Sequence, residues 1–152
     1  MDTKIQKLID LASKESKGIS VLNTVSELEN FYNSNFDKYK TWRAIASIED
    51  WLPVSPEFLQ EFRKKLSDAN VDTKVIFKES GIKYENAKLP NRQFKTVPDT
   101  YTFKSSIDIL DDKILIMNPH QTVLVLVIES PILVDIFIDM FDMLWKLLPE
   151  TE

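Results

Sequence analysis

The sequence predicts an α/β fold in which a mixed β-sheet is sandwiched by helices. Residues 122–128 form an apolar, β-branched run, which indicates a strand covered on both faces. Ser-Pro pairs at 55–56 and 130–131 indicate two helix starts, because serine caps free N–H groups and proline suits the first turn. Residues 40–78 follow the order strand, helix, strand, which favours a right-handed parallel crossover.

The N-terminal part is predicted to be helical. Residues 3–16 carry an apolar helical face, and Gly18 is the expected stop of this helix. After a short apolar run, Thr24 and Glu27 form a capping-box pattern that predicts the start of a second helix, which extends to Phe36. These residues therefore lead into the α/β part as a helix, the apolar run ISVL and a second helix.

The middle of the chain is expected to alternate between strand and helix. Residues 40–49 are predicted to form a strand, residues 55–70 a helix that ends at an asparagine, and residues 73–78 another strand. Residues 79–92 are polar and weakly patterned, which indicates a surface loop with a short helix.

The remaining elements are predicted to be mostly strands. Residues 93–97 form a strand that Pro98 ends, and residues 101–110 and 113–117 pair as a hairpin through the Asp111-Asp112 turn. The strand at 122–128 and a helix up to residue 148 close the domain. The expected order is β-α-β-loop-β-β-β-β-α.

The C-terminal helix is unusually apolar. Its polar residues Asp135, Asp139, Asp142 and Lys146 fall on one narrow stripe. We therefore expect the helix to be buried on more than one side, against its own sheet and against a second chain. A membrane span is disfavoured, because each central aspartate would cost roughly 2.5–3.5 kcal/mol on insertion. We expect an Asp142–Lys146 pair within the helix.

Composition excludes several classes of function. The 152 residues carry a net charge of −5, which argues against a nucleic-acid-binding surface spread over the domain. There is no cysteine, so disulfides, thiolate catalysis and cysteine metal sites are excluded. The two glycines, Gly18 and Gly81, are too few for a P-loop or a dinucleotide fingerprint. The polar N-terminus is unlike a signal peptide, and a cytoplasmic protein is expected.

Four segments together resemble a known family. They are VSELENFYNSNF, WRAIASIE with SPEFLQEFRKKL, IDILDDKILIM, and VLVIESPILVDIFIDMFDMLW. Their order and spacing resemble the C-terminal effector domain of TrmB-like transcriptional regulators, which has a phospholipase-D-like fold. The resemblance implies an effector domain at 19–149 preceded by a helical linker remnant at 1–18. No winged helix is recognised, so no direct nucleic-acid binding by this chain alone is expected, whether it is an excised domain or a stand-alone sensor.

The same fold family includes phosphodiesterases with the motif H-x-K-x-x-x-x-D, which supplies a histidine nucleophile, a phosphate-binding lysine and an orienting aspartate. Aligning this motif on Asp111 puts Lys104 at the histidine position and Ser106 at the lysine position. The single histidine, His120, lies beyond the hairpin and is expected in a turn or on the surface. The sequence therefore predicts no catalytic residues, no metal site and no cofactor.

The candidate ligand-binding residues are Val127, Ile128, Glu129 and Asp108. The first three match a strand-end Val-Ile-Glu run that contacts the sugar in sugar-sensing relatives, and Glu129 precedes a helix N-terminus, which favours a carboxylate. Alternatively, Glu129 stabilises only the helix start or pairs with Arg43 or Lys104. Asp108 interrupts an apolar strand, so it is either solvated or faces a cleft where it could bind a ligand hydroxyl.

These observations favour a non-catalytic, ligand-sensing regulatory domain, expected to be a homodimer with a small, sugar-like effector. The aromatic residues Phe137, Phe141 and Trp145 are the expected core, dimer or partner contacts. An alternative is a protein-interaction module that binds a partner chain through the apolar C-terminal helix. A degenerate phosphodiesterase is the third hypothesis.

Overall fold

The structure, a computed structural model, describes residues 3–8, 18–85, 88–120 and 124–151. From residue 18 onward its elements are β1 (Ile19–Leu22), α2 (Val25–Asn35), β2 (Thr41–Ala46), α3 (Ile48–Trp51), α4 (Pro56–Asp68), β3 (Asp72–Lys78), the 3₁₀ helix η1 (Glu79–Tyr84), β4 (Arg92–Val97), β5 (Ser106–Ile109), β6 (Ile114–Asn118), β7 (Leu124–Ile128) and α5 (Pro131–Leu147). From β2 onward this order confirms the predicted one, with α3 as an additional short helix.

The strands form one mixed sheet of seven in the order β1-β7-β6-β5-β2-β3-β4. The predicted crossover is confirmed, because β2 pairs with β3 in parallel, and β3 in turn pairs with β4 in parallel. The remaining neighbours are antiparallel. The hairpin from β5 to β6 closes at the predicted aspartate turn, where the Leu110 N–H donates to the Lys113 carbonyl at 2.8 Å.

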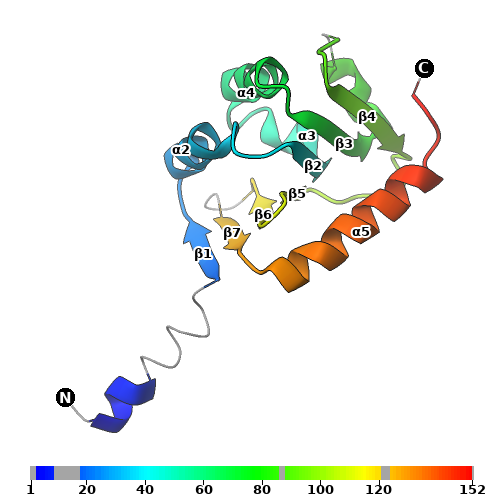
Figure 1. Cartoon of the computed structure of the whole chain (residues 1–152). Coiled ribbons are helices and arrows are strands. Elements are labelled where there is room, and N and C mark those ends of the chain that lie inside the picture. Colours follow the sequence, from blue (N-terminus) through cyan, green and yellow to red (C-terminus); the bar gives the residue numbers. More distant parts are fainter. Residues whose placement is uncertain (1–2, 9–17, 86–87, 121–123, 152) are drawn as a thin grey trace.

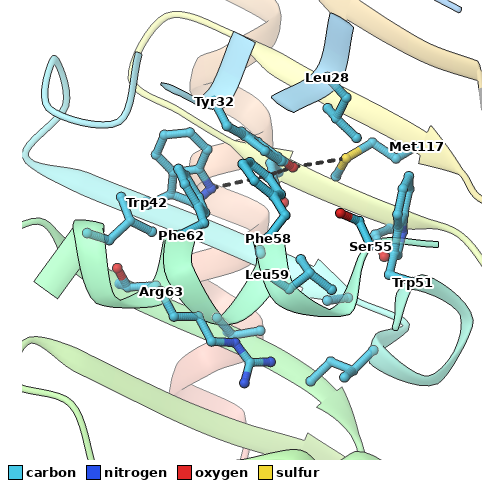
Figure 2. Close-up of a pocket in the computed structure, with 18 of the residues that line it drawn as sticks. Leu28, Tyr32, Trp42, Trp51, Ser55, Phe58, Leu59, Phe62, Arg63 and Met117 are labelled. Carbon is cyan, nitrogen blue, oxygen red and sulfur yellow. Dashed lines mark hydrogen bonds between the residues drawn. The ribbon is translucent and has the colours of Figure 1, made fainter. Parts of the chain in front are cut away.

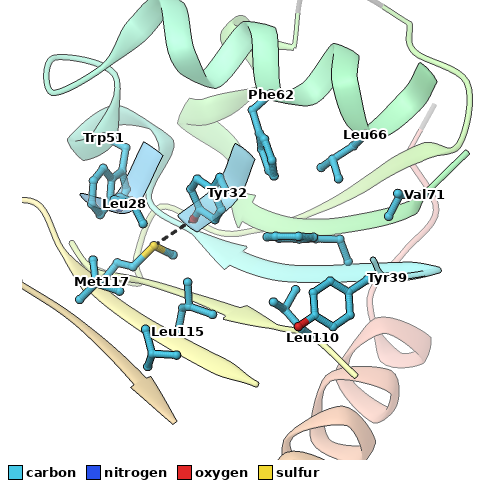
Figure 3. Packing of buried hydrophobic residues seen from close by; sticks show 13 residues of the cluster. Leu28, Tyr32, Tyr39, Trp51, Phe62, Leu66, Val71, Leu110, Leu115 and Met117 are labelled. Carbon is cyan, nitrogen blue, oxygen red and sulfur yellow. Dashed lines mark hydrogen bonds between the residues drawn. The ribbon is translucent and has the colours of Figure 1, made fainter. Parts of the chain in front are cut away.

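Helices cover the two faces of the sheet unequally (Figure 1). α2, α3 and α4 lie on one face, and α5 crosses the other. The larger core cluster lies between α2, α4 and the sheet, around Tyr32, Trp42 and Phe62 (Figure 3). A smaller cluster around Phe141 fastens α5 to the opposite face.

The predicted helix starts are confirmed at the level of backbone, but their caps differ. The Thr24 hydroxyl accepts a hydrogen bond from the Glu27 N–H at 3.1 Å, and Ser130 accepts one from the Leu133 N–H at 3.4 Å. Ser55 does not cap α4; its hydroxyl instead donates to the Glu29 carboxylate at 2.9 Å, which ties α4 to α2.

Two strands are shorter than predicted. The expected strand 101–110 is reduced to β5, because residues 101–105 lie outside the sheet, where the Phe103 carbonyl accepts a hydrogen bond from Lys78 at 2.9 Å. The expected strand 40–49 ends at Ala46, and its last residues enter α3.

The strand predicted at 122–128 was expected to be covered on both faces, but only one face of its described part, β7, is fully buried. Val125 and Val127 are buried in the core, whereas Leu124 on the opposite face is half exposed. Residues 122 and 123 of the predicted strand lie outside the described residues. No helix among the described residues is long and apolar enough to cross a membrane.

Candidate functional site

A cavity of about 110 Å³ lies between the sheet and the helices α2, α3 and α4 (Figure 2). Its lining is mainly aromatic and aliphatic, with a few polar groups from β5, α3 and α4. The lining includes Leu28, Tyr32, Trp42, Ala44, Ala46, Trp51, Ser55, Phe58, Phe62, Arg63, Arg92, Ser106, Asp108 and Met117. A concave, mostly apolar cavity with few polar groups is the usual form of a small-molecule site.

Small side chains on the sheet opposite large rings on the helices explain why this space is open. Ala44 and Ala46 alternate along β2 and point to the cavity side. Above them, Phe62 stacks on Tyr32 with ring centroids 4.6 Å apart and on Phe58 at 5.8 Å. Because these rings stack on one another, they keep the helices away from Ala44 and Ala46, and the space above β2 stays unfilled.

Asp108 lies at the floor of the cavity as a buried carboxyl group. Its Oδ2 accepts hydrogen bonds from the Tyr32 hydroxyl at 2.8 Å and from the Trp42 Nε1 at 3.1 Å. The Tyr32 hydroxyl also lies 3.1 Å from the sulfur of Met117. Of the two sequence alternatives for Asp108, solvated or facing a cleft, the structure places it inside.

Burial changes the protonation of this cluster. It raises the pKa of Asp108 to about 6, against the hydrogen bonds from Tyr32 and Trp42, which favour the carboxylate. Burial, together with the neighbouring Asp108, also raises the pKa of Tyr32 well above its ordinary value. Tyr32 therefore remains a hydrogen-bond donor, and Asp108 can take either form near neutral pH.

Two polar atoms in the lining are left for a ligand. Trp51 is 7% exposed, and its Nε1 is buried with no hydrogen-bond partner within the described residues. Both hydrogen bonds to Asp108 reach Oδ2, so Oδ1 has none from the part of the chain that the structure describes. A buried donor without a partner is costly, which makes Trp51 an indication of a missing acceptor.

One side of the cavity is closed by a buried charge cluster. Glu85 pairs with Arg92 at 2.5 Å and with Arg63 at 3.4 Å. The Arg63 guanidinium also donates to the Tyr84 carbonyl at 3.0 Å. Burial and the neighbouring Arg92 lower the pKa of Arg63 to about 10. Because both arginines already bind protein groups, we regard them as part of the border of the cavity and not as ligand-binding charges.

The structure separates the four predicted ligand-binding residues. Asp108 lines the cavity, whereas Val127 packs in the core and Ile128 is half-buried on the opposite face of β7. Glu129 is exposed, and its Oε1 lies 3.9 Å from the Lys113 Nζ. Its backbone N–H donates to the Gly18 carbonyl at 2.5 Å. Glu129 is thus part of the β7–α5 joint, away from the cavity.

The aromatic residues expected at a core, dimer or partner contact all face the sheet of their own chain. Phe141 is 1% exposed, and Phe137 and Trp145 pack against the same cluster. All three side chains lie on the side of α5 that packs against the sheet. The expected Asp142–Lys146 pair is replaced by an ion pair from Asp142 to Arg43 on β2 at 3.1 Å.

Two positions that align with the phosphodiesterase motif, Lys104 and Ser106, differ in burial. Lys104 is exposed, and Ser106 is buried, where its hydroxyl accepts a hydrogen bond from the Ser47 N–H at 2.9 Å. His120 contacts Asp50, which is also bonded by the Ser47 hydroxyl. The Asp50 carboxylate lies between the Ser47 hydroxyl and the His120 ring, so this cluster does not have the direct serine–histidine contact of an activated nucleophile.

Burial opposes ionisation of Asp50, yet the hydrogen bonds from Ser47 and His120 hold the pKa of Asp50 below its ordinary value. Asp50 is therefore an anchor for α3 and for the turn at His120. Among the described residues, no group of three histidines, aspartates or glutamates is arranged to hold a metal ion.

Sequence reasoning found Asp108 but missed its neighbours Tyr32, Trp42 and Trp51. Tyr32 looked like an ordinary residue of an apolar helical face. The available signal was the pair Ala44 and Ala46, small residues on alternate positions of a buried strand. Such a pair leaves space beside the sheet that larger strand residues would fill.

Comparison with known proteins identifies the fold. No protein-family model and no curated protein matches the sequence. Among solved structures, TrmBL2, described as an archaeal chromatin protein that shows a novel mode of DNA binding, superposes with a TM-score of 0.64 at 10% identity. This match covers 97% of the present chain and 64% of that chain, so the present chain spans less than two thirds of TrmBL2.

Two further structures match nearly over their whole length. NucT from Helicobacter pylori has a TM-score of 0.59 at 9% identity, with 88% of this chain and 98% of that chain covered. Nuc from Salmonella typhimurium, a phospholipase D family member, has a TM-score of 0.58 at 13% identity, with 88% and 99% covered. At these identities the likeness concerns the fold alone: the chain has a phospholipase-D-like α/β fold.

Proposed function

We propose that this chain is a non-catalytic, ligand-sensing domain of the type found in TrmB-like regulators, and that the cavity above Asp108 is its effector site. The observation that carries the proposal is the buried indole N–H of Trp51, which has no partner among the described residues and belongs to the lining of a preformed cavity. A ligand that accepts this hydrogen bond recovers the cost of burying it.

The lining restricts the chemistry of the effector. A hydroxyl group can accept from the Trp51 Nε1 and donate to the free Oδ1 of Asp108, whereas a purely apolar molecule can do neither. The other polar side chains of the lining are bonded within the protein: the Ser106 hydroxyl accepts from the Ser47 N–H, Ser55 donates to Glu29, and Arg63 and Arg92 pair with Glu85. These features favour a small, largely apolar alcohol or phenol over a sugar, whose many hydroxyls would be left without partners.

The size of the cavity agrees with such a ligand. An engineered apolar cavity of about 150 Å³ accepts benzene. A cavity of about 110 Å³ is slightly smaller, so a compact ring or branched alcohol fits after small side-chain movements. The mechanism would be a change in stability and packing of α3 and α4, the helices that border the cavity, when the hydroxyl bridges Trp51 and Asp108.

The test uses tryptophan fluorescence and thermal unfolding, because Trp42 and Trp51 are two of the three tryptophans and both line the cavity. Phenol, cyclohexanol, toluene and glucose are titrated into the protein. We expect phenol or cyclohexanol to raise the unfolding temperature and to change the fluorescence, with weaker effects of toluene and glucose.

Two variants locate the site. Ala46→Leu fills the cavity and should abolish the response, while Trp51→Phe should weaken alcohol binding by roughly 2- to 10-fold, the value of one hydrogen bond. Glu129→Gln is the matched control at the strand end that the sequence favoured. A response that Glu129→Gln removes and Ala46→Leu leaves intact would place the effector elsewhere and refute the proposal.

The absence of catalysis is part of the proposal and has its own assay. The positions expected for the nucleophile and the phosphate-binding lysine are Lys104 and Ser106, and His120 is engaged with Asp50. We expect no hydrolysis of bis(p-nitrophenyl) phosphate above the background of buffer. Hydrolysis that disappears in His120→Ala would show that the domain is an enzyme.

A further inference from the structure

The outward side of α5 carries a regular apolar stripe. Leu133, Ile136, Met140, Met143 and Leu147 follow one another at intervals of three, four, three and four residues. This is the a/d spacing of a coiled coil, in which each apolar residue meets a second helix. We call these five residues the α5 seam. Each of them is between 48% and 82% exposed.

The seam is separate from the side of α5 that packs on the sheet. That inner side consists of other residues, with Phe141 at its centre and Phe137 and Trp145 on either side. Ion pairing of Asp142 with Arg43 further fixes the rotation of the helix. The helix therefore cannot turn its seam inward without giving up the inner contacts, and within a single chain the seam stays in water.

Apolar side chains are also exposed on the face of the sheet against which α5 packs. Ile107 packs in the cluster beneath α5, and the same row of the sheet runs through Ile116 and Leu126 to Val21. Ile116 and Val21 are exposed, because α5 does not cover this part of the sheet (Figure 1). Several exposed apolar side chains on one face, in addition to the α5 seam, are typical of an interaction site.

The charged residues beside the seam indicate which kind of partner helix fits it. Asp139 and Lys146 are seven residues apart on the same flank of α5, both are exposed, and neither has an ion-pair partner among the residues that the structure describes. In an antiparallel helix pair such flanks face each other, so Asp139 meets Lys146 of the partner subunit, and the reverse contact occurs by symmetry. In a parallel pair Asp139 would instead lie level with its own copy.

We propose that the α5 seam pairs with the α5 seam of a second copy of this chain, antiparallel, about a two-fold axis between residues 141 and 142. Met140 then lies level with Met143 of the partner subunit, and Ile136 lies level with Leu147 of the partner subunit. The pairing is self-complementary, which is the requirement for a two-fold dimer. It does not depend on the effector site, which lies on the opposite face of the sheet.

The first test measures the mass of the protein in solution by sedimentation equilibrium. We expect a dimer that Ile136→Glu or Met143→Glu converts to a monomer, with an unchanged circular dichroism spectrum because both side chains are exposed. Ile82→Glu is the matched control, an exposed apolar residue on η1, away from α5, and should leave the dimer intact. A wild-type chain that stays monomeric at high micromolar concentration overturns the proposal.

The orientation is tested with introduced cysteines, which is direct because the chain has none. In the double variant Ile136→Cys and Leu147→Cys the two positions lie about 16 Å apart along one helix, at about 1.5 Å per residue, which is too far for a disulfide within one chain. We expect oxidation to give a covalent dimer of the double variant and little of either single variant. Efficient cross-linking of Leu147→Cys alone would show a parallel pair and overturn the proposed geometry.

The charge contacts are tested by reversal. Asp139→Lys and Lys146→Asp each place like charges together across the interface, so each should weaken the dimer several-fold. The double variant restores both contacts and should recover the wild-type dissociation constant, with the recovery lost at high salt. Equal weakening by the two single variants without recovery in the double variant would refute the antiparallel pairing.

Discussion

The two faces of the sheet use apolar side chains in opposite ways. On the face of α2 and α4, aromatic rings, a buried carboxyl group and a charge cluster enclose a cavity of about 110 Å³. On the face of α5, the inner side chains of the helix pack on the sheet around Phe141, but the outward side of the same helix remains apolar and exposed. The face of α2 and α4 therefore encloses an internal cavity, whereas on the face of α5 only the inner side of the helix has a packing partner within the chain.

This difference shows why overall apolarity is a poor guide to the place of a function. α5 is the more apolar helix, and it attracted both the predicted ligand site at its start and the predicted aromatic contacts along it. The internal polar groups lie instead beneath α2 and α4, where Asp108 accepts hydrogen bonds from Tyr32 and Trp42. Buried polar groups that need partners mark an interior site more reliably than apolar ones.

The largest expected effect separates the inner from the outer side of α5. Phe141→Ala removes a ring that is 1% exposed and should lower the free energy of unfolding by about 3–5 kcal/mol. Met143→Ala, on the seam, should change the stability of the monomer by less than about 0.5 kcal/mol. Urea unfolding in dilute solution measures both. Similar losses in the two variants would contradict the assignment of an inner and an outer side.

The second prediction concerns the charge cluster at the wall of the cavity. Glu85→Gln leaves the guanidinium groups of Arg63 and Arg92 next to each other without their carboxylate. Removing one partner of a buried ion pair costs about 3 kcal/mol or more, so a loss of this order is expected in chemical unfolding. The surface pair of Asp112 and Lys113 is the control, and Asp112→Asn should cost much less. A loss of less than about 1 kcal/mol for Glu85→Gln would mean that water screens the cluster.

The third prediction concerns Asp108 and pH. Its pKa is raised to about 6 by burial, above roughly 3.9 in the unfolded chain, so between these values the folded state binds more protons. Its contribution to stability is therefore fully present below pH ~4 and is lost as pH rises through ~6. The difference of about two pH units corresponds to about 3 kcal/mol.

Asp108→Asn should remove this dependence. The amide oxygen can still accept from Tyr32 and Trp42, and it carries no charge to bury, so the variant should be as stable as wild type or more stable at pH 7.5. Unfolding curves at pH 5 and pH 7.5 measure the difference between the two proteins. If wild type and variant respond equally to pH in this range, Asp108 is not the titrating group.

The elements and their order followed from sequence because each has a local cause. Alternating apolar positions, Ser-Pro starts and the aspartate turn act within a few residues, and they predicted the order from β2 to α5. Boundaries were less certain: residues 101–105 have strand-like side chains, but they do not join the sheet. The pairing of β1 with β7 is a contact across the whole chain that no local pattern encodes.

The site followed from sequence only in part, for a physical reason. Asp108 stood out because a charge in an apolar strand is costly. Tyr32, Trp42 and Trp51 have no such local anomaly, and their role arises only when three separate elements meet over Ala44 and Ala46. Likewise, the seam of α5 could not be told from its inner side, because both sides are apolar and only the tertiary contacts decide which faces the sheet.

The smallest expected effect is at Glu129, the residue that the sequence favoured most. Its carboxylate is exposed and 3.9 Å from Lys113, so Glu129→Gln should change the free energy of unfolding by less than about 0.5 kcal/mol. Ser130→Ala, at the next residue, removes the hydroxyl that caps α5 and should cost about 1 kcal/mol. Because the two residues are adjacent, the pair separates the carboxylate from the helix cap at one joint. A larger loss for Glu129→Gln than for Ser130→Ala would show that the carboxylate contributes more to the start of α5 than the serine cap does. The packing of α5 on the sheet would then depend on this charge.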